Sequence, residues 1–412
     1  MEYEDSVLQS LFSMFDEQSA GSESIGSRFD QTEFDALFQA LDQAEQPPSR
    51  IYTDASWFER ERTTIFHNAW HFFCLSTDVE QPGEYRTRRF LQSSLILVRG
   101  DDYKLRAFFN TCRHRGAPLT PREHGHVRNF ICPFHRWAYR RDGRLFKAPG
   151  LGVEERALGC IGSNLIELPC EVRENLVFVH LQPQPKYGLD EFLGDFISSV
   201  AHPHGVSNMR SVTHRRYRLN ANWKLYAEVD METLHTPHVH RRSIGEQPVE
   251  ITSSYGHWVG VFNRSDQTVA LPPDQRDSGF PFNAAAHGAG LEGTHFSIVF
   301  PGFFIVMAPD CMWWIQKTPI SATEVEVDVS YCFPTETIER SDFRDTLPRY
   351  VKRLDQVIEE DDDIVEYQQK GLNAYVSGRY TRQEAVVHAL VRRYVEIALR
   401  GDYSQPIRTH AS

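Results

Sequence analysis

The chain has 412 residues, more than one compact core accommodates, so we expect two domains of unequal size. Hydrophobic residues make up 41% and charged residues 24%, an ordinary globular composition that excludes a wholly disordered chain or a small disulfide-rich scaffold. The net charge is −12, and residues 1–49 hold eleven acidic residues and one arginine, so most of the excess lies there. This distribution argues against nucleic acid as a partner.

Two further features concern the compartment. No apolar run approaches the roughly 20 residues that span a bilayer, and the chain begins Met-Glu-Tyr-Glu-Asp, which is acidic where a signal peptide would be basic. The seven cysteines are odd in number and scattered, which is typical of thiols or metal ligands in a reducing compartment. We therefore expect a cytoplasmic enzyme or binding protein with no membrane segment.

Residues 1–49 are predicted to form an acidic, partly helical N-terminal extension. Apolar side chains recur at helical spacing in Val7–Phe15 and in Phe34–Leu41. They indicate either docking helices or, for residues 1–28, a mostly disordered tail with helical tendency. The Pro-rich stretch at 46–49 marks the boundary to the first domain.

The rest of the chain predicts an α+β protein. Residues 50–180 contain short apolar runs broken by Gly, Pro and Asp, which predicts a small antiparallel β domain. Residues 181–412 are predicted to form a larger domain with an antiparallel sheet and flanking helices, on which residues 28–49 could pack. In this domain, residues 324–331 alternate between polar and apolar, which predicts a strand with one wet and one buried face. Residues 341–374 have the period of a long helix.

The first candidate metal site consists of two short motifs, Cys112–His114 and Cys132–His135, separated by 17 residues. Each motif offers one thiolate and one imidazole. Four such ligands could hold zinc, and chance loop residues are a second alternative. One Cys and one His in each loop instead suits a two-iron cluster with sulfur ligands on one iron and nitrogen ligands on the other. Neutral imidazoles raise the potential of such a cluster to roughly −150 to +300 mV, so that it accepts an electron readily.

The second candidate site begins with His235, His238 and His240, three imidazoles within six residues. Two His and one carboxylate on one face of Fe(II) leave open positions for dioxygen. Pro237 is expected to break a helix after His235, so that the second imidazole comes from the following turn. On spacing alone, His238 and His240 compete for that role.

The predicted long helix supplies the carboxylate. Its apolar residues form a single inward stripe, which the acidic run 359–363 crosses once. Asp361 falls near the centre of the stripe, and Glu360 and Asp362 point about 100° to either side. An unpaired inward carboxylate is costly, so a metal or strong donors should hold it. The alternative is a solvated acidic face on a frayed or kinked helix. The stripe consists of Leu347, Tyr350, Val351, Leu354, Val357, Ile358, Ile364, Val365 and Leu372.

From about residue 50 to residue 400, the sequence resembles the α subunit, the terminal oxygenase component, of the Rieske non-haem iron oxygenases. The first motif resembles the Rieske pattern Cys-x-His…Cys-x-x-His, including its flanks at 110–111 and 115–119. Residues 222–240 are similar to the family's Asn-Trp-Lys…Glu-Asn-x-x-Asp-x-Tyr-His-x₄-His. Glu360 and Asp361, with Gln369-x-Gly371-Leu372, resemble its carboxylate helix.

The resemblance implies a catalytic domain of the helix-grip type and a role for each ligand. Cys112, His114, Cys132 and His135 would hold a Rieske 2Fe-2S cluster. His235, His240 and Asp361 would hold a mononuclear Fe(II), which decides for His240 over His238. The resemblance also implies a head-to-tail homotrimer. In it, Glu232 would bridge His235 and His135 of the neighbouring subunit and so connect the two metal centres. Its carboxylate would lie one helical turn before His235.

Three residues depart from the family pattern. Glu232 stands where Asp is commoner, Val229 replaces the usual Asn, and Leu234 replaces the usual aromatic residue before His235. A Glu at the bridge resembles the branches that act on quaternary ammonium compounds such as carnitine or betaines. The remaining context resembles ring-hydroxylating enzymes equally well.

The implied function is a terminal oxygenase that uses O₂ and electrons from NAD(P)H to hydroxylate or dihydroxylate a small substrate, foremost an aromatic compound in aromatic hydrocarbon catabolism. The electrons would arrive through a separate flavin and iron–sulfur reductase or a ferredoxin, since the chain has no dinucleotide-binding fingerprint. An additional β subunit is compatible with the resemblance.

The alternatives are a monooxygenase or N-demethylase of a quaternary ammonium compound, a Rieske electron carrier with a partner-binding domain, and a zinc-organised interaction protein. Five aromatic residues are candidates to line the pocket, although aromatic strand residues more often belong to the plain core: Phe300, Phe303, Phe304, Trp313 and Trp314.

Overall fold

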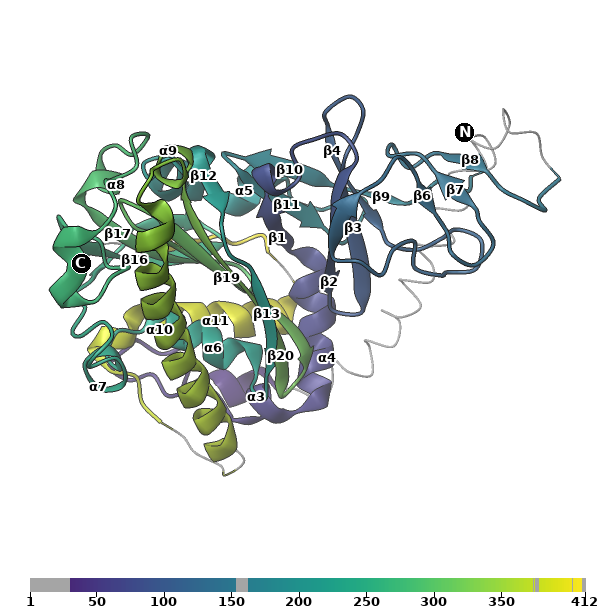
Figure 1. Ribbon diagram of the computed structural model, residues 1–412. Coiled ribbons are helices and arrows are strands. Elements are labelled where there is room, and N and C mark those ends of the chain that lie inside the picture. Colours follow the sequence, from purple (N-terminus) through teal and green to yellow (C-terminus); the bar gives the residue numbers. More distant parts are fainter. Residues whose placement is uncertain (1–29, 153–161, 373, 375–377, 402, 410–412) are drawn as a thin grey trace. The chain divides into compact units, whose positions relative to one another are not determined.

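The computed structural model describes residues 30–152, 162–372, 374, 378–401 and 403–409 (Figure 1). The chain divides into two compact units, the smaller containing Asp78–Glu171 and the larger containing Gln31–Thr77 and Pro185–Ser412. Residues 50–77, which the sequence assigned to the first domain, thus cluster with the larger unit. No helix in the described part of the chain combines the length and the apolarity needed to cross a membrane.

The first predicted apolar stripe, Val7–Phe15, lies outside the described residues. The second forms a 3-10 helix, η1 (Gln31–Phe34), followed by turns, instead of a regular helix. Phe34 and Leu37 are nevertheless buried, and the Phe34 ring lies 5.3 Å from that of Trp57. Packing within the larger unit, and not a regular helix, therefore explains this apolar pattern.

The smaller unit is an antiparallel β structure, as predicted. Its five-stranded sheet has the order β5–β2–β3–β4–β9, and β6–β7–β8 form a second sheet. Leu95–Val98 in β3 are buried on both faces, which explains their unbroken apolar run. The core of the unit contains both Cys112 and Cys132. The strands are β2 (Glu84–Phe90), β3 (Ser93–Arg99), β4 (Leu105–Phe109), β5 (His124–His126), β6 (Phe130–Ile131), β7 (Ala138–Tyr139), β8 (Leu145–Lys147) and β9 (Glu167–Leu168).

The larger unit contains an eight-stranded antiparallel sheet in the order β12–β20–β19–β18–β17–β16–β14, with β13 also paired to β20. In this unit β15 also pairs with β21, and a three-stranded sheet outside the eight-stranded one has the order β1–β11–β10. The strands are β1 (Trp70–Leu75), β10 (Cys170–Arg173), β11 (Leu176–His180), β12 (Met209–Ser211), β13 (Arg215–Leu219), β14 (Glu250–Ile251), β15 (Ser254–Gly256), β16 (Trp258–Arg264), β17 (Gly293–Val299), β18 (Phe303–Met307), β19 (Met312–Ser321), β20 (Glu324–Pro334) and β21 (Ile407–Thr409).

Strand β20 corrects one expectation. Burial alternates only from Glu324 to Val327, and every residue from Asp328 to Pro334 is buried. The polar face is covered because the neighbouring segment brings compensating groups. Arg216 Nε lies 2.8 Å from Asp328 Oδ1, and His214 Nε2 lies 3.1 Å from it. The prediction of a wet face is therefore wrong for the second half of the strand.

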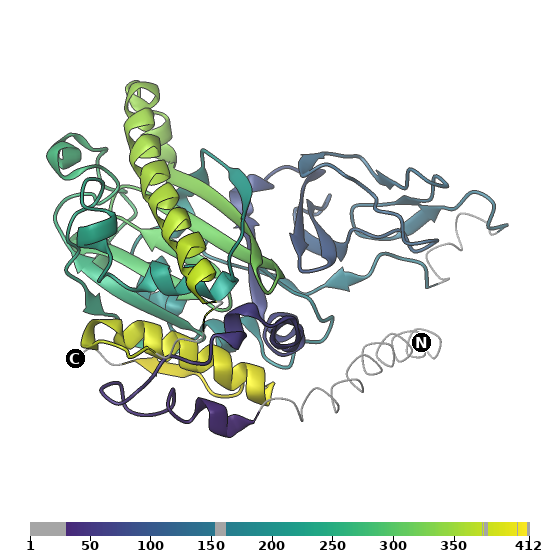
Figure 2. The same ribbon diagram turned by 90° about the horizontal axis from the view of Figure 1, so that it is seen from below.

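Helices flank the large sheet, which confirms the predicted α+β class (Figures 1 and 2). The longest, α10 (Phe343–Gly371), closely matches the predicted 341–374. Helix α6 contacts α10, α11, β17 and β19. Along the predicted inward stripe, Leu354, Ile358 and Val365 are buried, whereas Ile364 is 37% exposed. The helices are α3 (Arg50–Thr53), α4 (Ala55–Thr64), α5 (Leu189–Leu193), α6 (Trp223–Met231), α7 (Thr236–Val239), α8 (Ala289–Glu292), α9 (Thr335–Ile338), α10 and α11 (Ala385–Arg400); the short turns are η1, η2 (Phe66–Asn68), η3 (Ser76–Asp78), η5 (Ile197–Ala201), η6 (Val206–Asn208), η7 (Pro273–Ser278) and η8 (Arg382–Glu384).

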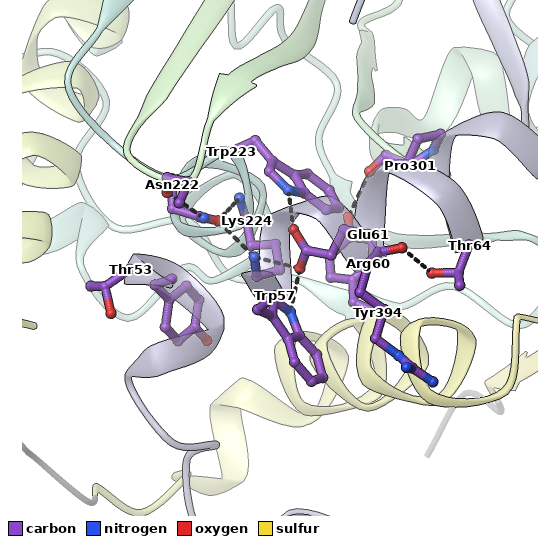
Figure 3. Close-up of polar contacts among 12 residues, drawn as sticks. Thr53, Trp57, Arg60, Glu61, Thr64, Asn222, Trp223, Lys224, Pro301 and Tyr394 are labelled. Atoms are coloured by element: carbon purple, nitrogen blue, oxygen red, sulfur yellow. Dashed lines mark hydrogen bonds and ion pairs between the residues drawn. The ribbon is translucent and has the colours of Figure 1, made fainter. Parts of the chain in front are cut away.

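A buried ion pair fixes the start of α6 (Figure 3). Asn222 caps this helix, and its Oδ1 accepts from the backbone N–H and the Nζ of Lys224. Lys224 Nζ lies 2.7 Å from Glu61 Oε1 in α4, and neither side chain is more than 1% exposed. Glu61 also accepts hydrogen bonds from the indoles of Trp57 and Trp223, at 2.7 and 3.0 Å. The Asn-Trp-Lys motif is therefore explained by packing: it ties α6 to α4.

Replacing Lys224 by Met is expected to lower the free energy of unfolding by about 3–5 kcal/mol, because Glu61 would then be a buried charge without its cation. The double variant Glu61→Gln with Lys224→Met should lose less than the sum of the single losses. Denaturant titration followed by tryptophan fluorescence measures both values. The exposed pair Arg340–Asp342 provides the control, since Arg340→Gln should change stability by less than about 1 kcal/mol. A loss of stability in Lys224→Met no larger than the loss in Arg340→Gln would contradict this account.

Candidate metal centres

The two Cys–His loops lie in the smaller unit, one after β4 and one between β6 and β7. Both cysteines are buried, with 2% of each residue exposed, while His114 is exposed and His135 half-buried. The two imidazole rings are 4.7 Å apart between centroids, at 76° to each other. Burial raises the pKa of the Cys112 thiol, and the nearby Cys132 acts in the same direction. A bound metal cation would stabilise both of these clustered thiols in their thiolate form.

The loop backbones explain how four ligands are held in place. The Cys112 N–H donates to Ala117 O, and the Cys132 N–H donates to Trp137 O, so each cysteine closes a tight turn. Gly116 sits at φ +75°, a conformation that side chains rarely adopt. His135 Nδ1 is buried and has no hydrogen-bond partner, which leaves its lone pair for a metal. The arrangement fits two thiolates on the buried side and two imidazoles on the exposed side.

Tyr139 adds a hydrogen bond to the sulfur ligands. Its hydroxyl accepts from the Arg113 N–H at 3.0 Å and lies 3.3 Å from Cys112 Sγ, so its own hydrogen points to the sulfur. Hydrogen bonds to the sulfurs of an iron–sulfur cluster stabilise its reduced form and raise its potential.

The variant Tyr139→Phe should therefore lower the midpoint potential of the small-unit centre by roughly 40 mV, which is about 1 kcal/mol for a one-electron couple. A redox titration of the visible absorption measures this shift. Tyr85→Phe is a matched control, because the Tyr85 hydroxyl bonds to Thr120 and not to a cysteine. A shift of the same size in both variants would contradict a specific effect of Tyr139.

In the larger unit, three ligand atoms from His235, His240 and Asp361 lie within 4.8 Å of one another. His235 precedes α7 and His240 follows it, while Asp361 comes from α10. Asp361 Oδ1 lies 2.8 Å from His240 Nε2 and 3.5 Å from His235 Nε2. This oxygen is buried and makes no hydrogen bond. Burial would raise the pKa of Asp361, but the two imidazoles hold it below its ordinary value.

Each imidazole is oriented by a second carboxylate. His235 Nδ1 lies 2.8 Å from Glu232 Oε1, and His240 Nδ1 lies 2.7 Å from Glu360 Oε2. Because an ionised carboxylate only accepts, each Nδ1 atom carries a hydrogen, and the Nε2 atom of each ring is the one that would bind a metal ion. Ser243 Oγ donates to the same Glu360 oxygen at 2.5 Å. Two neutral imidazoles and one carboxylate form the donor set that suits Fe(II) with open positions.

Several local expectations need correction. Helix α6 ends at Met231, before His235, and Pro237 lies in the first turn of α7, so Pro237 does not end the helix. Glu232 therefore reaches His235 through the turn between helices rather than along one helix face. His238 is not part of the converging group.

The residues beside Asp361 are partnered rather than free. Asp362 accepts from the Tyr217 hydroxyl at 3.2 Å, and Glu360 binds His240 as described. The role of Glu360 was not evident from the sequence. Its position one residue before the proposed ligand was the available signal.

A cavity borders the three converging ligands, and its apolar wall comes from one face of the large sheet. Phe304 and Trp313, two of the five predicted aromatic residues, line it. The others face elsewhere: Phe303 stacks on Phe72 at 3.9 Å, Phe300 lies 4.9 Å from Tyr394, and Trp314 lies 5.1 Å from Phe72. Alternation along β18 and β19 explains the division. The strand residues of the wall are Val261, Phe296, Phe304, Val306, Trp313 and Ile315.

Two family models match the chain. A Rieske 2Fe-2S domain matches residues 69–158, and a ring hydroxylating alpha subunit catalytic domain matches residues 206–399. Together with the site geometry, they define an oxidoreductase class that combines an iron–sulfur centre with a mononuclear non-haem iron. The chain belongs to the Rieske non-haem iron oxygenases.

The relatives act on different substrates. The α subunit of 2-aminobenzenesulfonate 2,3-dioxygenase from Alcaligenes sp is 32% identical over 195 residues, 45% of this chain, and the match spans only about half (48%) of that relative. The glycine betaine monooxygenase oxygenase subunit of Pseudomonas aeruginosa is 24% identical over 84% of this chain and 87% of its own. A solved structure of the quaternary ammonium Rieske monooxygenase CntA with gamma-butyrobetaine has a TM-score of 0.72 at 21% identity, covering 92% of this chain and all (100%) of that one. This likeness confirms the fold.

Proposed function

We propose that the chain is a terminal oxygenase component that hydroxylates or dihydroxylates a small organic substrate. In this proposal the 2Fe-2S cluster is held by Cys112, His114, Cys132 and His135. The mononuclear iron is held by a second set of residues, His235, His240 and Asp361. The convergence of this second set at an apolar cavity carries the proposal, because Asp361 Oδ1 is buried without a hydrogen bond. A metal ion is the partner that would satisfy this oxygen.

The chain's own residues prepare the site in three ways. Glu232 and Glu360 fix the tautomer and the ring orientation of the two histidines. The apolar wall, including Phe304 and Val306, keeps water away from the ligands. The remaining cavity holds the substrate beside them. When bound, the iron supplies the reductive activation of dioxygen.

Electrons come, in this proposal, from NAD(P)H through a separate reductase or a ferredoxin. Glu232 then has a second task, which is to connect His235 with His135 of a neighbouring subunit in a homotrimer. Its Oε1 accepts from the His235 ring and its Oε2 from the His235 backbone N–H at 3.0 Å. Each oxygen retains a lone pair, and the side chain is partly exposed, so a further donor can reach it. Purification from the native source would reveal a β subunit as an additional chain that elutes with this one.

For the substrate, an aromatic compound is the first candidate, because a mostly apolar wall surrounds the cavity. Oxidation of a quaternary ammonium compound is the second candidate, favoured by the length of the match to the glycine betaine subunit. A Rieske electron carrier with a partner-binding domain is the non-enzymatic alternative. It would leave the ligands in the larger unit without iron.

The test is turnover of the iron- and sulfide-loaded chain with NADH, a flavin and iron–sulfur reductase, and isotopically labelled dioxygen. The panel contains aromatic carboxylates, aromatic sulfonates, carnitine and glycine betaine. We expect oxygen uptake that depends on one class of compound, with label in the product. A cluster that is reduced and reoxidised at the same rate with every compound, without labelled product, would favour the electron carrier.

A further inference from the structure

The cavity contains a buried arginine. Arg353 belongs to α10, about two turns before Asp361, and it is only 3% exposed. Both residues line the same cavity. The guanidinium carbon lies 5.8 Å from the centre of the Trp313 ring, which holds the side chain along the sheet face. Arg353 therefore places a positive group in the wall of a mostly apolar space.

This arginine lacks the partners that other buried cations of the larger unit have. Lys224 pairs with Glu61, and Lys317 pairs with Asp230. Among the residues that the structure describes, no carboxylate lies within ion-pair distance of Arg353, and its Nε has no hydrogen-bond acceptor. The carboxylate of Asp361 faces the two imidazoles instead.

An unpaired buried cation is costly to the folded protein. Burial lowers the pKa of Arg353 to about 10, and the positive charge of nearby Arg276 acts in the same direction. The group still carries its charge at neutral pH. A ligand oxyanion would compensate this cost, because a guanidinium binds carboxylates and sulfonates through two parallel hydrogen bonds.

We infer that the cavity binds an organic anion, with a carboxylate or sulfonate at Arg353 and an apolar body against the sheet wall. The assignment of this anion as a substrate rests on the proposed function, whereas binding itself does not. Gln247 complements this arrangement, because its Oε1 is buried in the same wall without a donor. It can accept from an amino or hydroxyl group on the ligand.

The same contacts disfavour a cation cage. A trimethylammonium group needs several open aromatic faces. Here Trp313 already has Arg353 near its ring, and Phe304 has Lys317 Nζ at 5.1 Å from its ring centre. Two of the aromatic rings in the wall are thus next to a protein cation. A betaine would fit only by its carboxylate, with its ammonium group away from Arg353.

The first experiment measures ligand binding to the iron- and sulfide-loaded chain by titration calorimetry, without reductant. The probes are benzoate, benzenesulfonate, neutral benzamide and phenyltrimethylammonium. We expect at least one anion to bind about 30-fold more tightly than benzamide, and Arg353→Gln to remove most of that preference. Arg353→Lys should retain part of it. Arg349→Gln is the matched control on the same helix, since Arg349 bonds to Gln275 and Ser278.

The second experiment separates a ligand-binding role from a structural one. If Arg353 is kept for a ligand, Arg353→Met should raise the melting temperature of the ligand-free chain while abolishing stabilisation by anions. A structural arginine would give the opposite shift. Failure of both anions to bind the parent chain at millimolar concentration, or equal binding of benzamide, overturns the inference. Anion binding without any turnover would instead overturn the proposed function alone.

Discussion

Substitution of His240 by alanine is expected to abolish substrate oxidation, with a rate loss greater than about 100-fold, and to leave the cluster intact. His240 is 1% exposed, and its Nε2 lies 2.8 Å from Asp361 Oδ1. Removing this imidazole leaves one histidine and one carboxylate, which is too few ligands to retain the iron. The residues that would hold the cluster belong to the other compact unit.

Three measurements decide this prediction: iron per chain, the visible spectrum of the cluster, and labelled product. The matched control is His238→Ala, which removes a neighbouring imidazole outside the converging group and should retain iron and activity. Full turnover by the His240→Ala variant would falsify the assignment. Loss of iron in the His238 variant alone would transfer the ligand role to that residue.

The variant Glu232→Gln should slow electron transfer to the mononuclear site by at least about 10–100-fold while both centres stay loaded. Glutamine retains an acceptor for His235 Nδ1, so the ring keeps its orientation. It lacks the negative charge that strengthens this bond and attracts a second donor from the neighbouring subunit. The defect should therefore appear in transfer between centres and not in metal content.

Single-turnover kinetics tests this. The pre-reduced chain is mixed with substrate and dioxygen, and reoxidation of the cluster is followed by its visible absorption. Glu246→Gln, at an exposed position shortly after the site, serves as the control. An unchanged reoxidation rate in Glu232→Gln would exclude the bridging role, and loss of iron would reduce Glu232 to a support for His235.

Much of the second site was predictable because helical geometry is simple. The apolar stripe of α10 places Asp361 inward whatever the rest of the fold, and the structure puts its Oδ1 beside two imidazoles. The Cys–His loops were recognisable from their spacing together with their resemblance to the Rieske pattern. In both sites, the conformation of a short segment decides which ligand atoms point toward the metal position. Such local conformation is what a sequence encodes most directly.

The residues that sequence analysis missed depend on long-range packing. Glu360 was expected to point about 100° away from the stripe, and it binds His240, the residue that follows α7, from that side of α10. The partner of Lys224 is Glu61, more than 160 residues earlier, and Phe296 joins the cavity through strand pairing. That Arg353 has no carboxylate partner among the described residues can likewise be established only from the folded structure. Such contacts need the whole topology.

The most direct test of the central claim is the metal and sulfide content of the loaded wild-type chain. The account predicts about three irons and about two acid-labile sulfides per chain, the extra iron being lost in His240→Ala. An iron content that never exceeds the two irons of the cluster would mean that the chain is only an electron carrier. Zinc without sulfide, in a colourless protein, would contradict both iron centres at once.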